Sequence, residues 1–367
     1  MKRALSVFLV SIFLFSVSAQ KSTYRLLIGT YTNPDKSKGI YTYDVDIQNN
    51  VFTQKSVTSG IQNPSFMAVT PDKKFVYSVS ESTDGSSANA FSFNVNTGYL
   101  KFINSSLTKS NGPCNISVTG NHVFTANYDG GSISVFGRET DGSLTGVLQV
   151  IQHTGKGINT ERQNEPHVHQ VLVAPVGNYV LANDLGTDKV TVYQYNKNAT
   201  SNVLIPFDTL NVKPGSGPRH AVFSKDGTRL YLVQEIDGTV SVLGFKDGRL
   251  KLIQETTVDY KAGIINRAAD IHLSPDENFL YVTNRGTAND ITCFSVAKNG
   301  RLTFRQQIST GGDGPRNFAL TPDGKFVFVA NQNTDNIVIF SRNSQTGFLT
   351  NTGKQLKIGA PVCLLFY

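Results

Sequence analysis

The chain has 367 residues, 39% of them hydrophobic and 17% charged, and its formal net charge at pH 7 is +7. This composition excludes a disordered chain and is typical of a soluble globular protein, while the length exceeds one ordinary core and suits an array of repeats. The basic excess is modest and forms no block of Lys and Arg, so we expect no nucleic-acid partner.

The N-terminus carries a targeting signature. Lys2 and Arg3 precede a short apolar run, which gives way to small residues that end at Ala19. This order predicts a secretory signal peptide over residues 1–19, whose cleavage leaves Gln20 as the first residue. The apolar run is too short for a membrane span. We therefore expect an exported protein, periplasmic or secreted, with no membrane span after cleavage.

One pattern recurs along the rest of the chain. A strand that opens at a Pro is followed by a turn such as Thr-Pro-Asp-Gly and by a second strand, as from Gly217 to Glu235. The opening position is occupied, in chain order, by Pro64, Pro113, Val168, Pro218, Ala268, Pro315 and Pro361. The successive spacings are 49, 55, 50, 50, 47 and 46 residues, and each copy continues with two more strands. Seven copies of a four-stranded unit predict an all-β fold, a seven-bladed β-propeller.

The copy at the C-terminus is incomplete. Residues 359–366 match only the first strand of a unit, and the chain then stops. Residues 25–31 match a second strand that has no first strand before it, and the third and fourth strands follow at 39–45 and 51–57. We predict that the C-terminal strand completes the N-terminal blade, which closes the ring and removes two exposed sheet edges. Residues 20–367 then form a single domain, which we expect to be monomeric.

Three positions of the repeat hold unlike residues where a packing position would hold one type. The first ring position, directly after the opening residue, is occupied by Ser65, Cys114, His169, Arg219, Ala269, Arg316 and Val362. The second ring position, one residue further, is occupied by Phe66, Asn115, Gln170, His220, Asp270, Asn317 and Cys363. The third ring position, which ends the second strand, is occupied by Tyr31, Glu81, Tyr128, Asp184, Glu235, Arg285 and Gln332. Because the two strands are antiparallel, all three positions should surround one mouth of the central channel.

Ionisable side chains from different blades therefore converge on one concave mouth, which indicates a ligand or catalytic site. Each residue taken singly also has a structural alternative. Glu235 and Asp184 would serve as salt-bridge partners of neighbouring Arg residues. Any one of Arg219, Arg285 and Arg316 would serve as a structural clamp between blades. A lone His at such a place would be a hydrogen-bonded structural residue, and His272, in the middle of a strand, is expected to be one.

Several kinds of chemistry lack their motifs. There is no Gly-x-Ser-x-Gly elbow, no His-Glu-x-x-His and no Gly-rich phosphate loop. Cys114, Cys293 and Cys363 match no metal spacing and are expected to be small buried residues. His167 and His169 could share one face of a strand and hold a metal ion, but no third ligand is evident, so we expect no metal and no cofactor.

A metal-free pocket of His, Arg and Glu suits lactone hydrolysis. A general base takes a proton from water as the water attacks the ring carbonyl, and fixed donors stabilise the charge that develops on the carbonyl oxygen.

Six short motifs stand in order along the chain: Ile28-Gly-Thr-Tyr-Thr32, Pro166-His-Val-His169, Gly217-Pro-Arg-His220, Ala269-Asp-Ile-His272, Asn284-Arg285 and Gly314-Pro-Arg-Asn317. The ordered set resembles the seven-bladed β-propeller lactonase family. That family includes the propeller-type 6-phosphogluconolactonases and the fungal carboxymuconate-cyclising enzyme. The similarity covers nearly all of the predicted mature chain.

The resemblance also implies catalytic residues. The residues proposed for the muconate-type relative match His169, Arg219, Glu235 and Arg285. On this basis His169 or Glu235 is the base, while Arg219 and Arg285 stabilise an oxyanion and a substrate carboxylate. The other polar groups at the predicted mouth are expected to bind substrate: His167, His220, Asp270, Arg316, Gln332, Glu81, Asn115 and Asp184.

The predicted function is hydrolysis of a small-molecule substrate, a gluconolactone-like sugar lactone. Two alternatives stay open. One is an isomerase or lyase of the muconate type, which forms or opens a lactone by proton transfer with the same residues. The other is a propeller that binds a ligand or a protein without catalysis. Because a phosphorylated lactone is not expected outside the cytoplasm, an exported copy would act on an unphosphorylated sugar lactone or on another ester.

Overall fold

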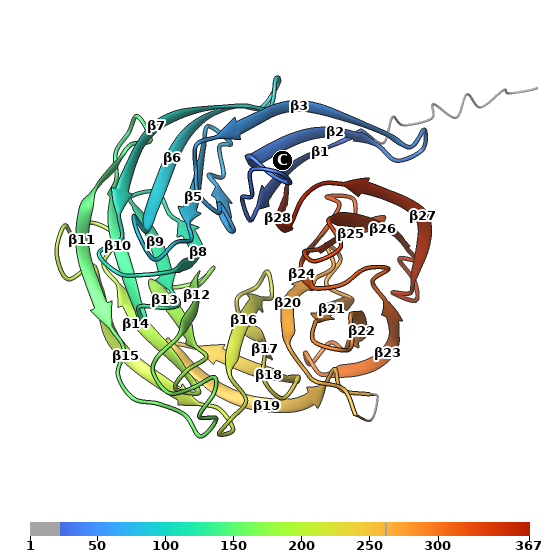
Figure 1. Ribbon diagram of the computed structural model, residues 1–367. Coiled ribbons are helices and arrows are strands. Elements are labelled where there is room, and N and C mark those ends of the chain that lie inside the picture. The colour runs from blue at the N-terminus through green and yellow to red at the C-terminus, as the bar shows by residue number, and fades with distance from the viewer. Residues whose placement is uncertain (1–22, 261–262) are drawn as a thin grey trace, which may run out of the picture.

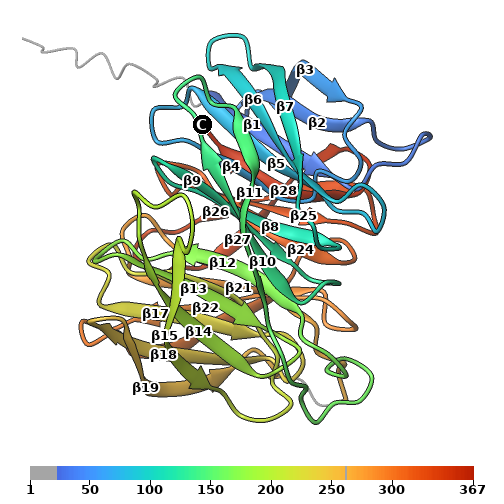
Figure 2. The same ribbon diagram turned by 90° about the vertical axis from the view of Figure 1, so that its left-hand side faces the viewer.

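The fold is a closed ring of seven four-stranded antiparallel sheets, seen in a computed structural model that describes residues 23–260 and 263–367 (Figure 1). The predicted signal peptide, residues 1–19, lies outside the described residues. No helix in the described part of the chain is long and apolar enough to cross a membrane. Figure 2 shows the ring from the side, with the sheets arranged as blades around its axis.

Each sheet is called a blade, and its strands are given from the axis outwards. Blade 1 consists of β28 (Pro361–Phe366), β1 (Thr23–Thr30), β2 (Gly39–Asp46) and β3 (Val51–Ser59). Blade 2 consists of β4 (Met67–Val69), β5 (Phe75–Ser80), β6 (Ser87–Asn94) and β7 (Tyr99–Leu107). Blade 3 consists of β8 (Pro113–Val118), β9 (His122–Asn127), β10 (Ser132–Arg138) and β11 (Leu144–Gln152).

The remaining four blades follow the same order. Blade 4 consists of β12 (Val168–Val173), β13 (Tyr179–Asp184), β14 (Lys189–Tyr195) and β15 (Leu204–Asn211). Blade 5 consists of β16 (Pro218–Phe223), β17 (Arg229–Gln234), β18 (Thr239–Lys246) and β19 (Arg249–Thr257). Blade 6 consists of β20 (Ala268–Leu273), β21 (Phe279–Asn284), β22 (Asp290–Val296) and β23 (Leu302–Ser309). Blade 7 consists of β24 (Pro315–Leu320), β25 (Phe326–Asn331), β26 (Asn336–Arg342) and β27 (Leu349–Lys357).

Blade 1 is built from both ends of the described chain. The C-terminal strand β28 pairs antiparallel with β1, so that Leu26 lies opposite Phe366 and Ile28 opposite Leu364. The backbone N–H of Tyr31 also donates to the carbonyl oxygen of Ala360, at 3.0 Å. The prediction that the C-terminal strand completes the N-terminal blade is confirmed, and Figure 1 shows β28 and β1 side by side.

The apolar core lies between neighbouring blades. Val233 of blade 5 and Leu280 of blade 6 belong to one buried cluster, and Leu26 of blade 1 shares another with Phe328 of blade 7. Each sheet therefore buries its faces against the next sheet, and the last blade packs against the first. Such a blade cannot bury its own apolar surface, so stability depends on ring closure. The three cysteines are free and buried, as expected.

The repeated Asp-Gly motif is explained by turn chemistry. Between β16 and β17, the Asp226 carboxylate accepts hydrogen bonds from the Ser224 hydroxyl at 2.5 Å and from the Thr228 backbone N–H at 2.9 Å. Gly227 follows with φ of +68°, a conformation that favours Gly. These turns join the two inner strands of a blade at the end opposite to the three ring positions, which leaves the other end free for a site.

Candidate active site

The inner strands carry a β-bulge at the first ring position. In β16 the pairing with β17 shifts between Pro218 and His220, so Arg219 is an additional residue in the strand. The same irregularity occurs at Cys114, His169 and Arg316. A bulge changes the direction of a side chain. At each of these four bulges, the side chain of the additional residue lines the central channel.

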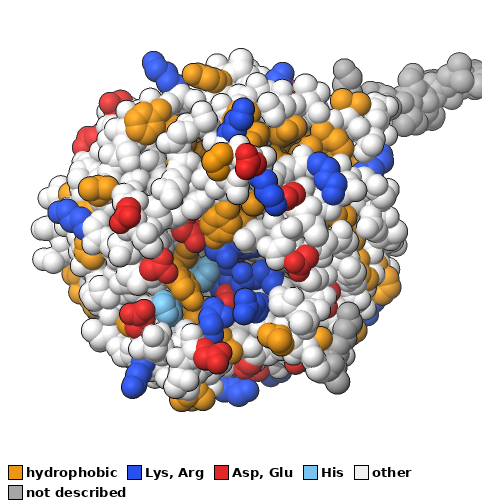
Figure 3. All heavy atoms as spheres, in the orientation of Figure 1, with side chains coloured by type: hydrophobic (Ala, Val, Ile, Leu, Met, Phe, Trp, Pro, Cys, Tyr) orange, Lys and Arg blue, Asp and Glu red, His pale blue; other side chains and the backbone are white. Residues whose placement is uncertain are grey.

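The side chains at the first and second ring positions enclose a narrow axial cavity with a volume of about 10 Å³. Its lining residues are Ser65, Phe66, Cys114, His169, Arg219, His220, Arg316, Asn317 and Val362. Figure 3 shows Lys or Arg side chains and His side chains gathered in a hollow near the middle of the ring. The site is therefore basic and concave, and it lies on the axis of the propeller.

Glu235 is the centre of an ionic cluster at the channel mouth. Its carboxylate accepts hydrogen bonds from Arg219 Nε at 2.9 Å, from Arg285 Nη2 at 2.9 Å and from Arg162 Nη2 at 2.6 Å. The side chains of Arg219 and Glu235 are only 1% and 5% exposed, whereas that of Arg162 is 30% exposed. We call these four residues the Glu235 cluster. It brings together three of the four predicted catalytic residues, from blades 5 and 6.

The charge state of the Glu235 cluster follows from its packing. Burial alone would raise the pKa of Glu235, but Arg285, Arg219 and Arg162 outweigh it and hold that pKa well below its usual range. Burial lowers the pKa of Arg285 to about 9, against the opposing effect of Glu235. At neutral pH the cluster therefore contains one carboxylate and three guanidinium cations. The mouth therefore carries a net positive charge, which favours the binding of an anionic group.

A second polar group faces the channel from blades 1, 2 and 7. The Tyr31 hydroxyl donates to both carboxylate oxygens of Glu81, at 2.9 and 3.1 Å, and the Ser65 hydroxyl donates to the same carboxylate. The Arg316 guanidinium lies over the Tyr31 ring, 5.4 Å from its centre. Arg316 forms no ion pair or hydrogen bond with another side chain among the described residues. Its donors are therefore open to a ligand in the channel.

His169 lies between the two polar groups. Its Nδ1 is 3.8 Å from the Cys114 sulfur, and its ring meets the rings of Tyr128 and His220 edge-on, at 5.5 and 5.1 Å. Burial and the neighbouring Arg219 lower the pKa of His169 well below its usual value, so the imidazole is neutral at pH 7. Burial also raises the pKa of Cys114, which keeps it a thiol and a poor nucleophile.

Other predicted binding residues lie beside the site or are directed away from it. The His167 ring stacks on Tyr128 at 4.3 Å, and its Nδ1 is 3.0 Å from the Tyr128 carbonyl oxygen. Asp184 is completely buried and accepts hydrogen bonds from His153 Nδ1 and from the His167 backbone, both at 2.8 Å. Gln332 is half-buried, directly after β25. Asp184 therefore braces blade 4 and does not reach the Glu235 cluster.

The described residues, with 1–22 and 261–262 left aside, contain no group of three or more His, Cys, Asp or Glu side chains that could hold a metal ion. His167 directly precedes β12 and His169 lies within it. The Nδ1 of His167, however, is already in contact with the Tyr128 carbonyl oxygen. The geometry offers no donor set for a metal at the axial cavity.

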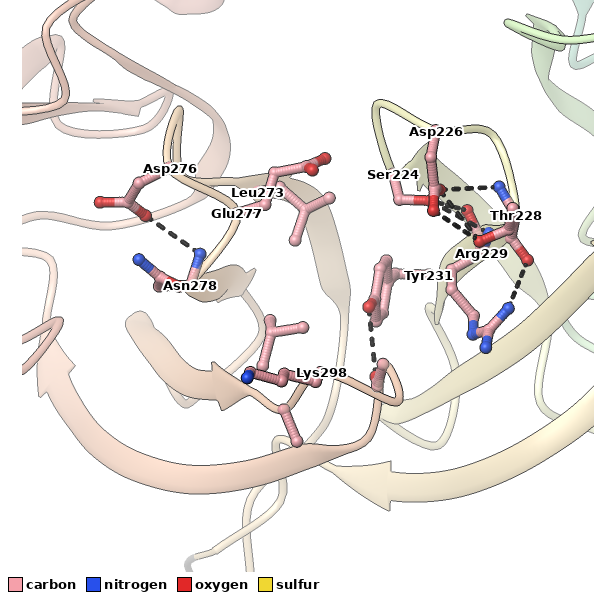
Figure 4. Close-up of a pocket in the computed structure, with 13 residues that line it drawn as sticks. Ser224, Asp226, Thr228, Arg229, Tyr231, Leu273, Asp276, Glu277, Asn278 and Lys298 are labelled. Atoms are coloured by element: carbon pink, nitrogen blue, oxygen red, sulfur yellow. Dashed lines mark hydrogen bonds between the residues drawn. The ribbon is translucent and has the colours of Figure 1, made fainter.

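A larger pocket, of about 310 Å³, lies on the turns between blades 5 and 6 (Figure 4). Its polar groups bond to one another: Asp226 to Ser224 and Thr228, and Tyr231 to the carbonyl oxygen of Gly300. These contacts belong to the repeated turn chemistry, and other charged groups of the lining bind neighbours as well: Arg229 donates to the Thr228 carbonyl oxygen and Asp276 pairs with Arg342. We therefore place the candidate site at the axial cavity.

Arg162 is a member of the Glu235 cluster that the repeat did not predict. It lies between β11 and β12, where it donates to Glu235 and, at 3.2 Å, to the Tyr128 hydroxyl. Ring positions are found by comparing the repeated strands of the blades, and the connection that carries Arg162 lies outside those strands. One signal did mark it: the spacing of 55 residues from Pro113 to Val168 is the longest in the chain.

Fold and site together define a closed seven-bladed propeller with an ionisable site at its channel mouth. The family described as "Lactonase, 7-bladed beta-propeller" matches residues 25–366, and the chain belongs to this family. A 6-phosphogluconolactonase of Formosa agariphila is 35% identical over 93% of this chain and 99% of that protein. A 6-phosphogluconolactonase of Bacillus subtilis is 33% identical over 92% of this chain and 97% of that protein.

Solved structures agree with this assignment. A crystal structure from Bacteroides fragilis matches with a TM-score of 0.91 and 40% identity, over 95% of this chain and 99% of that chain. The periplasmic gluconolactonase of Pseudomonas aeruginosa matches with a TM-score of 0.88 and 36% identity, over 94% of this chain and 99% of that chain. The resemblance expected from the six motifs is thereby confirmed.

Proposed function

We propose that this protein hydrolyses a gluconolactone-like sugar lactone by direct attack of water on the ring carbonyl, without a metal ion. The observation that carries this proposal is the Glu235 cluster, in which one carboxylate holds the side chains of Arg162, Arg219 and Arg285 together at the channel mouth. Guanidinium donors held in place stabilise negative charge as it develops on a carbonyl oxygen. The family and the names of the relatives support the same reaction class.

The Arg residues differ in their hydrogen-bond partners and exposure, and we assign them different roles on this basis. Arg219 is held at both ends, by Glu235 and by the Ala269 carbonyl oxygen at 2.6 Å, so it is a rigid donor beside the axial cavity. Arg285 is 14% exposed, and its pKa of about 9 leaves it charged at neutral pH. Arg316 has open donors that suit a substrate carboxylate or hydroxyl groups. In this proposal Arg219 and Arg285 face the carbonyl oxygen, and Arg316 orients the sugar.

The proposal includes export. It is supported by the signal-peptide signature of residues 1–19 and by the similarity to a periplasmic gluconolactonase. Outside the cytoplasm the expected substrate is an unphosphorylated lactone. The intact mass of the protein recovered from an exporting host is expected to match a chain that begins at Gln20. A recovered protein that keeps residues 1–19 would contradict export by cleavage.

A panel of sugar lactones tests the function. Purified protein is incubated with five- and six-membered lactones, each with and without a phosphate group, and products are identified by NMR spectroscopy. We expect the free hydroxy acid to form faster than in buffer alone, with unphosphorylated lactones preferred and with no effect of a chelator.

Other outcomes of the panel would contradict parts of this proposal. A rearranged lactone in place of the hydroxy acid would indicate the isomerase. Binding without turnover of any lactone would indicate a binding propeller. A loss of activity on chelation that a divalent cation restores would contradict the metal-free mechanism.

A further inference from the structure

The second ring position holds the blades together. In four blades its side chain accepts a hydrogen bond from a backbone N–H of the next inner strand. The pairs are Asn115 with Val171 at 3.1 Å, Gln170 with Ala221 at 2.7 Å, Asp270 with Phe318 at 3.3 Å and Asn317 with Leu364 at 2.7 Å. The predicted binding residue Asn115 thus braces the ring.

His220 occupies the second ring position of blade 5 and does not form this bond. The backbone N–H of Ile271, its expected partner, donates at 3.0 Å to Asp270 Oδ1 instead. His220 Nδ1 lies 2.9 Å from the same carboxylate oxygen. Because a carboxylate only accepts, we assign the ring proton to Nδ1. His220 Nε2 is then the acceptor of a neutral imidazole.

This acceptor belongs to a side chain that lines the axial cavity. His220 lines the cavity beside Arg219 and His169, its side chain is 5% exposed, and its Nε2 is buried without a hydrogen-bond partner among the described residues. An Asn at this position would form the brace found in two other blades, and a buried acceptor without a partner is destabilising. An unpartnered, buried lone pair that faces a small polar cavity points to a bound hydrogen-bond donor. Water is the smallest such donor.

Asp270 holds His220 in this orientation. Besides His220 and Ile271, its carboxylate accepts from His272 Nε2 at 2.9 Å and from Asn317 Nδ2 at 2.6 Å. Burial alone would raise the pKa of Asp270, but the two His partners outweigh it and keep that pKa far below its usual range. The carboxylate is therefore a permanent anion beside His220 Nδ1. It can stabilise the imidazolium that forms when Nε2 takes a proton.

The other candidate bases lack this combination. Glu235 receives three guanidinium groups, which lower the proton affinity of its carboxylate. His169 has the Cys114 sulfur beside its Nδ1 and no carboxylate partner among the described residues. Its imidazolium would face Arg219 and Arg316 without a counter-charge. His220 alone combines a free lone pair in the cavity with an adjacent carboxylate.

We infer that His220, positioned by Asp270, is the general base that takes the proton of the attacking water in the axial cavity. This inference rests on the proposed lactone hydrolysis. The water oxygen bonds to the carbonyl carbon, its proton moves to His220 Nε2, and the carbonyl electron pair moves to the oxygen that faces Arg219. The bond from the carbonyl carbon to the ring oxygen then breaks, and the ring oxygen takes the proton back from His220. Lactone and water are converted to the hydroxy acid.

The repeat itself supplies the test variant. His220→Asn places the side chain of blades 3 and 7 at this position, where it can accept from the Ile271 N–H, so we expect the unfolding midpoint to be unchanged or higher. Loss of a general base is expected to lower kcat by about 10²–10⁴-fold with little change in KM. His220→Gln, copied from Gln170 of blade 4, gives the same test should the Asn variant fold poorly.

The matched control is His122→Gln. His122 is another buried His, 3% exposed, but its Nδ1 lies 2.9 Å from the Tyr195 hydroxyl oxygen, its Nε2 lies 3.0 Å from the Ala199 carbonyl oxygen, and it does not line the axial cavity. We expect the folded variant to keep kcat within about twofold of the parent. An equal loss of kcat in both variants would mean that replacement of a buried His is itself responsible, and it would overturn the assignment.

The pH profile gives a second measurement. Burial and Arg219 lower the pKa of His220 to about 4, although Asp270 acts in the opposite direction. The charged and titratable groups that share the cavity with it or contact it are Asp270, Arg219, His169, Arg316 and Cys114. We expect kcat/KM to fall below about pH 4, because the base must be unprotonated, and we expect the residual activity of His220→Asn to lack this limb.

The assignment of the base and the proposed lactonase function can be overturned separately. A stable His220→Asn or His220→Gln protein with wild-type turnover overturns the base assignment and leaves the lactonase proposal intact. A parent protein that turns over no lactone of the panel overturns the proposed function, and with it the base.

Discussion

Deletion of residues 359–367 is expected to abolish soluble folded protein. The deletion removes β28, which exposes the hydrogen-bonding edge of β1 and the apolar surfaces of blades 1, 2 and 7. Val362, Cys363 and Leu364 are each at most 2% exposed. Burial of such side chains contributes roughly 1.5–3 kcal/mol each, against a total stability of about 5–15 kcal/mol. Expression yield, size-exclusion chromatography and thermal unfolding measure the effect.

A circular permutant is the matched control for this deletion. The end of β28 lies beside the start of β1, since the N–H of Tyr367 donates to the carbonyl oxygen of Arg25 at 3.1 Å. A chain that begins at Gly359, joins Tyr367 to Thr23 through a short Asp-Gly turn and ends at Ile358 keeps every strand. We expect it to fold with nearly the parent unfolding midpoint. A deletion variant that melts like the parent would contradict the closing role of β28.

Much of the fold could be predicted from the sequence because the propeller repeats one unit. The Pro that opens most inner strands and the Asp-Gly turn that follows recur at nearly constant spacing, and the incomplete copies at the two ends are complementary. The same repeat predicted that Arg219 begins and Glu235 finishes one hairpin, so that the two residues lie at the same end of the blade. Their atoms meet at 2.9 Å in the structure. Sequence comparison between blades thus predicts which side chains meet at the open end of a hairpin.

The parts that the sequence did not predict depend on local geometry that no repeat position encodes. A β-bulge directs the first ring position into the channel, while Asn115 at the second ring position bonds to the next blade. Asp184 belongs to the third ring position, as Glu235 does, yet its partner is His153, which follows the last strand of blade 3. Arg162 comes from an inserted connection and is found only when the chain is folded. Residues at equivalent positions therefore differ in role according to their neighbours.

Replacement of Glu235 by Gln is expected to produce the largest loss of stability among the single substitutions. The substitution keeps the shape of the side chain but leaves Arg162, Arg219 and Arg285 close together without their shared carboxylate. Removal of one partner from a buried ion pair costs roughly 3–5 kcal/mol. Because Arg219 and Arg285 are then free to separate, lactone turnover is expected to fall by about a hundredfold. Denaturant unfolding and kcat of the folded protein measure the two effects.

Two comparisons decide whether the shared carboxylate is responsible. Arg162→Gln alone should cost at most about 1 kcal/mol, because its ion pair is partly exposed. The double variant Glu235→Gln/Arg162→Gln should be more stable than Glu235→Gln, since it removes one of three uncompensated cations.

The pKa of Glu235 in the folded protein lies below its unfolded value of about 4.3. The contribution of Glu235 to the free energy of unfolding is therefore complete above that pH and is lost as the pH falls further. Glu235→Gln should therefore show a weaker loss of stability in acid than the parent. A Glu235→Gln protein with parental stability, turnover and acid sensitivity would show that the cluster neither supports the fold nor orients the Arg residues that we propose to be catalytic.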